Sequence, residues 1–311
     1  MKIVFAGTPE FALAPLKAIV DAGYEVVGVV TQADKPQGRK GILTPPPVKT
    51  LAESLGLPVL QPSKIKDSLE ELKALGGDLL VTCAYGQILT QAVLDVFPLG
   101  VWNIHAGLLP FYRGASPIQS CILNGETETG VSVMRTELGL DTGDILLVER
   151  TEIIDSETYG ELSDRLSVLG GKAIVDALRL LQSGEYTLVK QGEDGARTVR
   201  KITKEQAKID FSRTMQEIVN LVRGMNPAPV AYTQTETGVL NIYRAEPAPE
   251  FALEEGVCGE IVCDIPKKGL VVKCGDGAVR LTEVQPTGGK RMKGSDFLNG
   301  RKVQKGQVFL C

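Results

Sequence analysis

Residues 103–114 read Asn103-Ile104-His105-Ala106-Gly107-Leu108-Leu109-Pro110-Phe111-Tyr112-Arg113-Gly114, and they follow an apolar run from Leu99 to Trp102. An apolar run that meets a loop containing Gly and Pro is typical of a buried strand that ends there. Because side chains alternate along a strand, Asn103 and His105 are expected on the same face. Open α/β sheets bind ligands at the carboxyl ends of their strands, so this stretch predicts a site at such an edge.

Three polar residues near this strand end have the chemistry of an acyl-transfer site. His105 is the only histidine among 311 residues, so imidazole chemistry near neutral pH has to use it. The Asn103 amide can donate to a developing oxyanion without titrating. Asp141, in a Gly-rich run, is expected to orient the imidazole and to raise its pKa. We therefore predict Asn103, His105 and Asp141 as catalytic residues, with an acceptor that brings its own amine.

The first half of the chain alternates predicted strands and helices. Lys2 to Ala6 and Val26 to Thr31 read as strands, and the residues between them have helical spacing, with Thr8 as the expected N-cap. The alternation continues to a long amphipathic helix at Thr158 to Ser183. We predict an α/β fold, a Rossmann-like doubly wound parallel sheet. The opening lacks G-x-G-x-x-G, which argues against a dinucleotide cofactor.

The second half has a different pattern. From Val230 onward, short β runs are separated by Gly and Pro, which predicts a small β-barrel of the OB-like type. We expect a catalytic domain at 1–183, a linker at 184–203, and a C-terminal domain at 204–311 that binds RNA.

Two segments are basic, although the formal net charge of the chain is −4. Gln32 to Lys49 is broken by Gly and Pro and is too long for an ordinary connection, and loops of this kind are usually functional or disordered. Lys290 to Lys305 contains six basic residues and one acidic residue. Because the global charge is negative, a nucleic acid would have to be held by such local patches. A solvated surface would have a similar composition.

Taken together, these motifs resemble those of the 10-formyltetrahydrofolate-dependent formyltransferases. The resemblance rests on Asn103-x-His105, the following Leu-Leu-Pro and Tyr-Arg-Gly, and Asp141-Thr142-Gly143-Asp144. It extends to both ends of the chain, including Phe5-Ala6-Gly7-Thr8-Pro9 and Lys290-Arg291-Met292, and the C-terminal pieces are typical of the members that act on methionyl initiator tRNA. Two positions depart from the pattern: Gly107 stands where Ser is usual, and Phe111 where a basic residue is common.

This resemblance implies transfer of a formyl group from 10-formyltetrahydrofolate to the α-amino group of methionyl initiator tRNA, by a monomer. The residues that it implies for the folate site are Gly107, Leu108, Leu109, Pro110, Ile88, Leu89 and Asp144. The residues expected to bind tRNA are Lys35, Arg39, Lys40, Lys290, Arg291 and Lys293.

The composition sets further expectations. No stretch approaches the apolar length of a membrane span, and Met1-Lys2 leads into a strand rather than a signal peptide, so we expect a cytoplasmic protein with no membrane partner. The six cysteines lack C-x-x-C spacing, and the only histidine lies far along the chain from Cys258, Cys263 and Cys274. We therefore expect no metal site.

The residues leave alternatives open. The acceptor of the same chemistry could be a small amine such as an amino sugar nucleotide, although such an acceptor needs neither basic segment. A non-catalytic RNA-binding protein is a second alternative, against which the intact Asn103, His105 and Asp141 argue. A folate hydrolase that uses water as the acceptor is a third.

Overall fold

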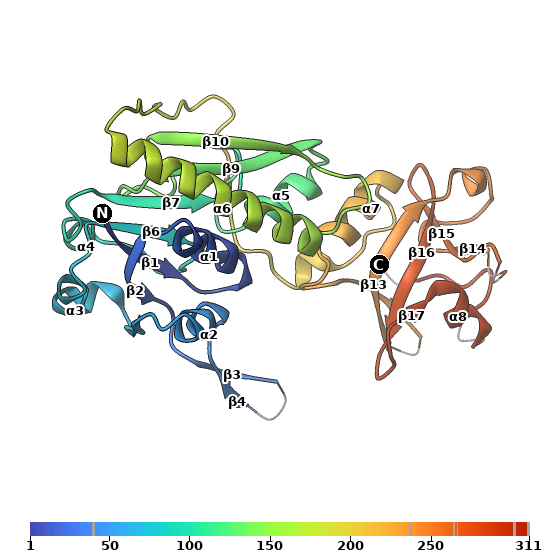
Figure 1. Cartoon of the computed structure of the whole chain (residues 1–311). Helices are drawn as coiled ribbons and strands as arrows, with labels where there is room; N and C mark the ends of the chain where they lie inside the picture. Colours follow the sequence, from blue (N-terminus) through green and yellow to red (C-terminus); the bar gives the residue numbers. More distant parts are fainter. Residues whose placement is uncertain (39–40, 237, 264, 266, 301–302, 310–311) are drawn as a thin grey trace. The chain divides into compact units, whose positions relative to one another are not determined.

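The computed structural model of the chain describes residues 1–38, 41–236, 238–263, 265, 267–300 and 303–309. They form two compact units, and Figure 1 labels most of the helices and strands. The first unit comprises Met1–Pro117, Glu128–Glu152 and Ser163–Val199, and the second comprises Ile118–Thr127, Ile153–Leu162 and Arg200–Cys311. The units are thus interleaved along the chain. Residues 184–199, which the sequence suggested as linker, belong to the first unit.

The first unit is built on a seven-stranded sheet of order β10-β9-β7-β6-β1-β2-β5. Its strands are β1 (Lys2–Gly7), β2 (Glu25–Val30), β5 (Val59–Leu60), β6 (Leu79–Cys83), β7 (Val101–His105), β9 (Glu128–Arg135) and β10 (Ile145–Glu152). The strands from β7 to β5 pair in parallel, whereas β9 pairs antiparallel with β7 and with β10. The predicted parallel α/β sheet is confirmed, with an antiparallel extension at one edge.

The central strands of this sheet, such as β1 and β6, are buried on both faces, which explains their nearly continuous apolar runs. On one face, Val4 and Leu80 pack with Leu72 and Val93 of the helices that connect the strands, while Phe5, on the opposite face of β1, is also fully buried. The helical segments of this unit are η1 (Glu10–Ala12), α1 (Leu13–Asp21), α2 (Pro47–Ser54), η2 (Ile65–Asp67), α3 (Leu69–Ala74), α4 (Gln91–Leu94) and most of α6 (Tyr159–Ser183).

Two glycines let α6 lie close to its neighbours. A Cβ on Gly170 would lie 3.1 Å from Cγ2 of Ile104 on β7, and one on Gly171 would lie 3.1 Å from the Ala14 carbonyl oxygen of α1. Larger side chains would therefore push the helix away from the strand that carries His105.

Two local expectations in this unit are corrected. Thr8 is not an N-cap: its hydroxyl donates to the carbonyl of Tyr85 at 3.0 Å, and a 3₁₀ turn capped by Pro9 precedes α1. The irregular segment at 32–49 contains a hairpin of β3 (Lys35–Gln37) and β4 (Ile42–Thr44), and its last residues start α2. Periodicity could not reveal strands of three residues.

The second unit contains one antiparallel sheet of order β12-β13-β16-β15-β14, with β17 also paired to β16. Its strands are β12 (Ala231–Thr235), β13 (Gly238–Pro247), β14 (Ile261–Cys263), β15 (Leu270–Cys274), β16 (Gly277–Pro286) and β17 (Met292–Lys293). Its helical segments are α5 (Pro117–Leu123), η3 (Glu205–Ala207), α7 (Met215–Gly224), η4 (Pro249–Phe251) and α8 (Gly294–Asn299). The prediction of a separate β-rich C-terminal domain, stated above as a small OB-like β-barrel, is confirmed as a domain built on an antiparallel sheet, and β12 is a strand that the sequence pattern did not reveal.

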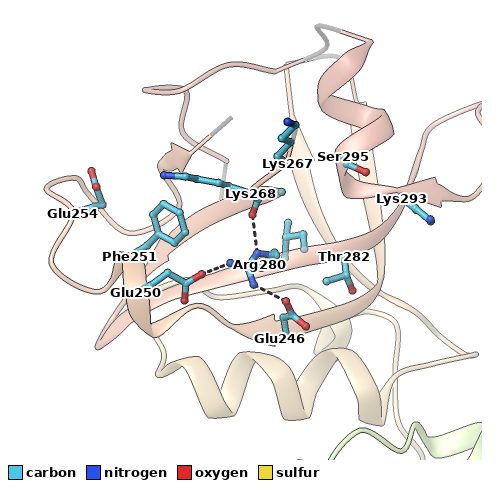
Figure 2. A pocket seen from close by; sticks show the side chains of 12 residues that line it. Glu246, Glu250, Phe251, Glu254, Lys267, Lys268, Arg280, Thr282, Lys293 and Ser295 are labelled. Carbon is cyan, nitrogen blue, oxygen red and sulfur yellow. Dashed lines mark hydrogen bonds and ion pairs between the residues drawn. The ribbon is translucent and has the colours of Figure 1, made fainter. Parts of the chain in front are cut away.

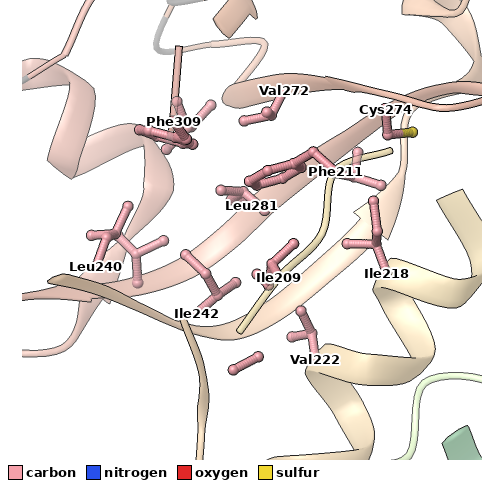
Figure 3. Close-up of a cluster of buried hydrophobic side chains, with 14 of the residues drawn as sticks. Ile209, Phe211, Ile218, Val222, Leu240, Ile242, Val272, Cys274, Leu281 and Phe309 are labelled. Atoms are coloured by element: carbon pink, nitrogen blue, oxygen red, sulfur yellow. The ribbon is translucent and has the colours of Figure 1, made fainter. Parts of the chain in front are cut away.

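This sheet has its own hydrophobic core, so the second unit does not depend on the first for a buried interior. Figure 3 shows Phe211 and Ile242 among its buried side chains, together with Ile218 and Val222 from α7. Helix α7 begins with a capping box, in which the Thr214 hydroxyl and the Glu217 backbone and carboxylate are paired. In the part of the chain that the structure describes, none of the helices is long and apolar enough to cross a membrane.

Candidate active site

The predicted catalytic strand, β7, lies between a parallel and an antiparallel neighbour. Asn103 pairs with Thr82 of β6, and His105 pairs with Ser132 of β9. Figure 1 shows β6, β7 and β9 side by side in this order. Because Asn103 and His105 are two residues apart on one strand, their side chains lie on the same face, as expected.

His105 and Asp141 come together at this strand end, although they are far apart in the sequence. The imidazole is only 4% exposed, and its Nδ1 lies 3.6 Å from Oδ2 of Asp141. The same Oδ2 accepts a hydrogen bond from the backbone N–H of Gly114 at 2.8 Å. Asp141 has a φ of 53°, which is unusual for a residue other than glycine. The carboxylate is thus held beside the imidazole by a contact of its own.

The environment of His105 has opposing effects on its pKa. Burial lowers the pKa of His105, and the Asp141 carboxylate and the Tyr112 carbonyl, which lies 3.1 Å from Nε2, act in the raising direction. The net direction is down. The expectation that Asp141 raises this pKa is correct for the contribution of Asp141, but the cost of charging a buried ring is larger.

The Asn103 amide is hydrogen-bonded through its oxygen to the neighbouring strand β6. Its Oδ1 accepts from the hydroxyl of Thr82 on β6 at 2.9 Å, and Asn103 is partly exposed. Among the described residues, the structure gives Asn103 Nδ2 no acceptor. These N–H groups are therefore available to the oxygen of a bound carbonyl.

The loop after β7, residues 107–110, packs directly against the imidazole. A Cβ on Gly107 would lie 3.2 Å from His105 Nε2. The Ser132 hydroxyl donates to the Gly107 carbonyl at 2.7 Å and accepts from the Leu109 N–H at 3.1 Å. Leu109 is buried against Met134 and Ile145, and the peptide bond between Leu109 and Pro110 is cis. Leu108 and Pro110 are partly exposed beside it.

The other expected folate residues lie on neighbouring loops. Ile88 and Leu89 follow β6, where Ile88 is 87% exposed and Leu89 packs against the sheet core. Asp144 ends the loop that contains Asp141, and its carbonyl accepts from the Arg135 N–H at 2.9 Å. Loops from β6, β7 and β9 thus border this edge of the sheet.

The residues expected to bind tRNA are placed in part. Lys35 lies in the β3–β4 hairpin, and its Nζ donates to Gln32 at 2.6 Å. Arg39 and Lys40 lie outside the described residues. Lys49, which adds to the basic character of this segment, is paired with Asp34 at 2.9 Å.

In the second unit, Lys290 and Lys293 are exposed, whereas Arg291 has intramolecular partners. Its guanidinium binds both carboxylate oxygens of Glu283, at 2.5 and 2.7 Å, and lies 4.1 Å from the centroid of the Tyr243 ring. The hydrogen bonds that the guanidinium donates to Glu283 raise the pKa of Arg291. Its charge is therefore largely compensated within the unit.

Lys293 also lines a cavity of about 780 Å³ in the second unit (Figure 2). At its centre, Arg280 donates to Glu246 at 2.6 Å, to Glu250, and to the Lys268 carbonyl at 2.8 Å. The cavity mixes acidic and basic side chains, and none of Asn103, His105 and Asp141 lines it. Among the described residues, no group of three or more His, Cys, Asp or Glu side chains is placed to hold a metal ion.

Sequence reasoning missed two residues at the site. Gln191 donates to the carbonyls of Asp141 and Gly143, and the buried Arg113 donates to Gln191. Arg113 stood in the quoted motif without an assigned role. Gln191 stood in the presumed linker, where no local pattern pointed to it.

Comparison with protein families gives two matches that together span most of the chain. The Formyl transferase model matches residues 1–178, which include all three predicted catalytic residues, and the model of the Formyl transferase C-terminal domain matches residues 201–302. The chain belongs to the formyl transferase family. The formyl transferase resemblance predicted from the motifs around Asn103 and Asp141 is confirmed.

Similar formyl transferases include curated proteins that match the chain over nearly their whole length. The chain is 45% identical over 311 residues to a methionyl-tRNA formyltransferase from Ruminiclostridium cellulolyticum, covering 99% of each chain. It is 44% identical to methionyl-tRNA formyltransferases from Symbiobacterium thermophilum, with 99% of this chain and 95% of the relative covered, and from Neisseria gonorrhoeae, with 98% and 99% covered.

Two solved structures share the fold at lower identity. WlaRD, a sugar 3N-formyl transferase crystallised with dTDP and 5-N-formyl-THF, has a TM-score of 0.65 at 21% identity and covers 90% of this chain and 96% of its own. A HypX variant from Aquifex aeolicus has a TM-score of 0.68 at 15% identity and covers 99% of this chain and 51% of its own.

Proposed function

We propose that the chain transfers the formyl group of 10-formyltetrahydrofolate to the α-amino group of methionyl initiator tRNA, for translation initiation. The observation that carries the proposal is the pairing of the only imidazole of the chain with Asp141 at 3.6 Å, beside the available amide of Asn103. These residues lie in a chain of the formyl transferase family. Its relatives at 44–45% identity over nearly the whole chain are methionyl-tRNA formyltransferases. None of the three predicted catalytic residues is assigned to attack the formyl carbon. The site therefore suits an acceptor whose own amine is the nucleophile.

In this proposal, each catalytic residue acts on a different atom of the reaction. The acceptor amine attacks the formyl carbon, a C–N bond forms, and the C–N bond to the folate breaks. The Asn103 amide donates to the formyl oxygen, which becomes negative as the amine attacks. The imidazole of His105, when protonated, stabilises the same oxygen. Asp141 holds the imidazole and helps move the proton from the attacking amine to the departing folate nitrogen, directly or through water.

The placement of the surrounding loops supports a folate site at this edge. The loop at Gly107, Leu108, Leu109 and Pro110 contacts the imidazole, and Ile88, Leu89 and Asp144 lie on loops from the adjoining strands. We propose that these residues line the folate pocket and that no metal takes part. The partly exposed Asn103 amide suits a formyl oxygen in this place.

For the tRNA, we propose local contacts rather than attraction by the whole chain, whose net charge is −4. Lys35 lies in the β3–β4 hairpin next to Arg39 and Lys40 in sequence, and Lys290 and Lys293 are exposed in the second unit. We propose 1–183, together with residues 184–199 of the same unit, as the catalytic domain and 204–311 as the tRNA-binding domain of a cytoplasmic monomer.

The experiment that tests the function is single-turnover transfer of labelled formyl from 10-formyltetrahydrofolate to methionyl initiator tRNA. Methionyl elongator tRNA and free methionine serve as controls, and Arg39→Ala tests the hairpin. We expect fast transfer to the initiator tRNA alone, weakened by Arg39→Ala. Transfer to an amino sugar nucleotide, with none to any aminoacyl-tRNA, would overturn the proposed acceptor.

A further inference from the structure

Residues 189–199 run along the loops that carry the proposed catalytic groups. At one end, Val189 and Ile145 exchange two backbone hydrogen bonds of 2.8 Å. At the other end, β11 (Thr198–Val199) pairs in parallel with β8 (Arg113–Gly114), and the Ala115 N–H donates to the Val199 carbonyl at 2.9 Å. The segment is thus fastened at both ends to the first unit, a position that a free linker would not have.

Gln191 lies between these two attachments, and both ends of its amide are used. Its Nε2 donates to the Asp141 carbonyl at 2.9 Å and to the Gly143 carbonyl at 2.7 Å. Its Oε1 accepts from Nε of Arg113 at 3.0 Å. Because carbonyls only accept and a guanidinium only donates, these partners leave one possible orientation of the amide.

Arg113 is itself held in place, so it is a firm anchor for Gln191. The residue is 7% exposed, and its guanidinium also donates to the Gly192 carbonyl at 3.3 Å. Arg113 precedes Gly114, whose N–H donates to the Asp141 carboxylate. One strand therefore supports Asp141 twice, through the Gly114 N–H to its side chain and through Gln191 to its backbone.

Asp141 needs such support because its backbone has a φ of 53°, in the left-handed region that residues with a side chain rarely adopt. A relaxation of this residue would move its carboxylate away from the imidazole. We propose that Gln191 is a positioning residue for Asp141, and that it keeps the carboxylate within reach of His105 without touching the substrate. The inference rests on the catalytic roles proposed above for His105 and Asp141.

The test compares Gln191→Met and Gln191→Glu with the wild type and with an Asp141→Asn background. Met has a similar length but makes no such hydrogen bonds, and Glu can still accept from Arg113 but cannot donate to the two carbonyls. Lys190→Met is the matched control, because Lys190 is the exposed neighbour of Gln191 in the same segment. We expect both Gln191 variants to lower kcat about tenfold or more with little change in KM for the tRNA. The control should leave both values unchanged.

A second measurement does not depend on activity. Since His105 is the only histidine, NMR of its ring protons gives its pKa directly. If Gln191 holds the Asp141 carboxylate in place, Gln191→Met, which adds no charge, lowers the pKa of His105 and has no further effect on pKa or kcat in the Asp141→Asn background. A pKa and a kcat equal to those of the wild type would overturn the inference, and so would an equal loss in both backgrounds. Absence of formyl transfer by the wild type would count against the proposed function alone, because the titration would still test the positioning role.

Discussion

At the scale of single residues, the surroundings of His105 have two opposing effects on its pKa. The ring is buried, which disfavours its charged form, yet Nδ1 faces the Asp141 carboxylate and Nε2 faces the Tyr112 carbonyl. Since both neighbours are acceptors, a proton on the second nitrogen would improve the contacts of the ring. We therefore expect the imidazole of His105 to gain its second proton during the reaction rather than to be protonated throughout.

The first prediction concerns turnover. His105→Ala and Asp141→Ala should each lower kcat about 10²-fold or more, because each removes a contact that stabilises the transition state. Single-turnover formyl transfer measures the effect, and the circular dichroism spectrum of each variant should match that of the wild type. Rates near the wild-type value in either variant would refute the assigned roles.

The second prediction concerns stability as a function of pH. Because burial lowers the pKa of His105 below its usual 6.5, the unfolded chain binds a proton more readily than the folded one as the pH falls below about 6.5. The contribution of His105 to the free energy of unfolding is complete above this pH and is lost as the pH falls through the lower folded value. His105→Gln should lose this part of the pH dependence.

Trp102 provides the readout, since it is the only tryptophan and lies beside Asn103 on β7. Its fluorescence during urea unfolding, at pH 7.5 and at pH 5.5, gives the free energy of unfolding of wild type and His105→Gln. An identical change between the two pH values in both proteins would contradict the prediction.

At the scale of elements, the loop between β9 and β10 depends on close backbone approach. A Cβ on Gly143 would lie 1.8 Å from the carbonyl oxygen of Arg135, a distance that backbone atoms cannot accommodate without moving. Asp141 is two residues away in the same loop. The loop therefore has to be rebuilt if any side chain is added at Gly143.

The third prediction follows from this geometry. Gly143→Ala should lower kcat about 10²-fold, because a displacement of the order of 1 Å at a reacting group has an effect of this size. KM for the tRNA should change little, since this loop contains none of the proposed tRNA-binding residues Lys35, Lys290 and Lys293. Steady-state kinetics separates the two quantities, and a variant with unchanged kcat would show that the loop tolerates the added atom.

Much of the element pattern could be predicted from local sequence. The strand that ends at His105 and the long helix α6 have clear periodicity, so they were found nearly to the residue. The β3–β4 hairpin and β12 were missed, because strands this short or this polar depend on pairing rather than on pattern. Thr8 has a side chain that can cap a helix, but its hydroxyl donates to the carbonyl of Tyr85, which is distant in sequence.

At the scale of the whole molecule, a chain with a net charge of −4 has to bind a polyanion through selected cations. Lys290 and Lys293 are exposed, whereas Arg291 is paired with Glu283 and Lys49 with Asp34. A count of basic residues therefore overstates the charge available to RNA.

The fourth prediction separates these two groups. Lys290→Ala and Lys293→Ala should each reduce the slope of log affinity for tRNA against log salt by about one, because each removes one phosphate contact. The double variant Arg291→Gln/Glu283→Gln keeps the net charge of the chain and should leave the slope unchanged. Filter-binding titrations over a range of salt concentrations measure the slopes, and a reduced slope in the double variant would place Arg291 on the phosphate backbone.

The sequence by itself determined the α/β alternation, the β-rich second half, the strand end that holds Asn103 and His105, and the family resemblance. These properties follow from local periodicity and from short motifs, which can be identified without knowledge of tertiary contacts. The sequence also led us to expect Asp141 beside His105, and the structure supplies the distance of 3.6 Å. Only the tertiary structure decided that Gln191 and Arg113 support Asp141 and that Arg291 is paired with Glu283. Each of these contacts joins residues from separate segments, and no local pattern encodes which loops the packing of the strands brings together.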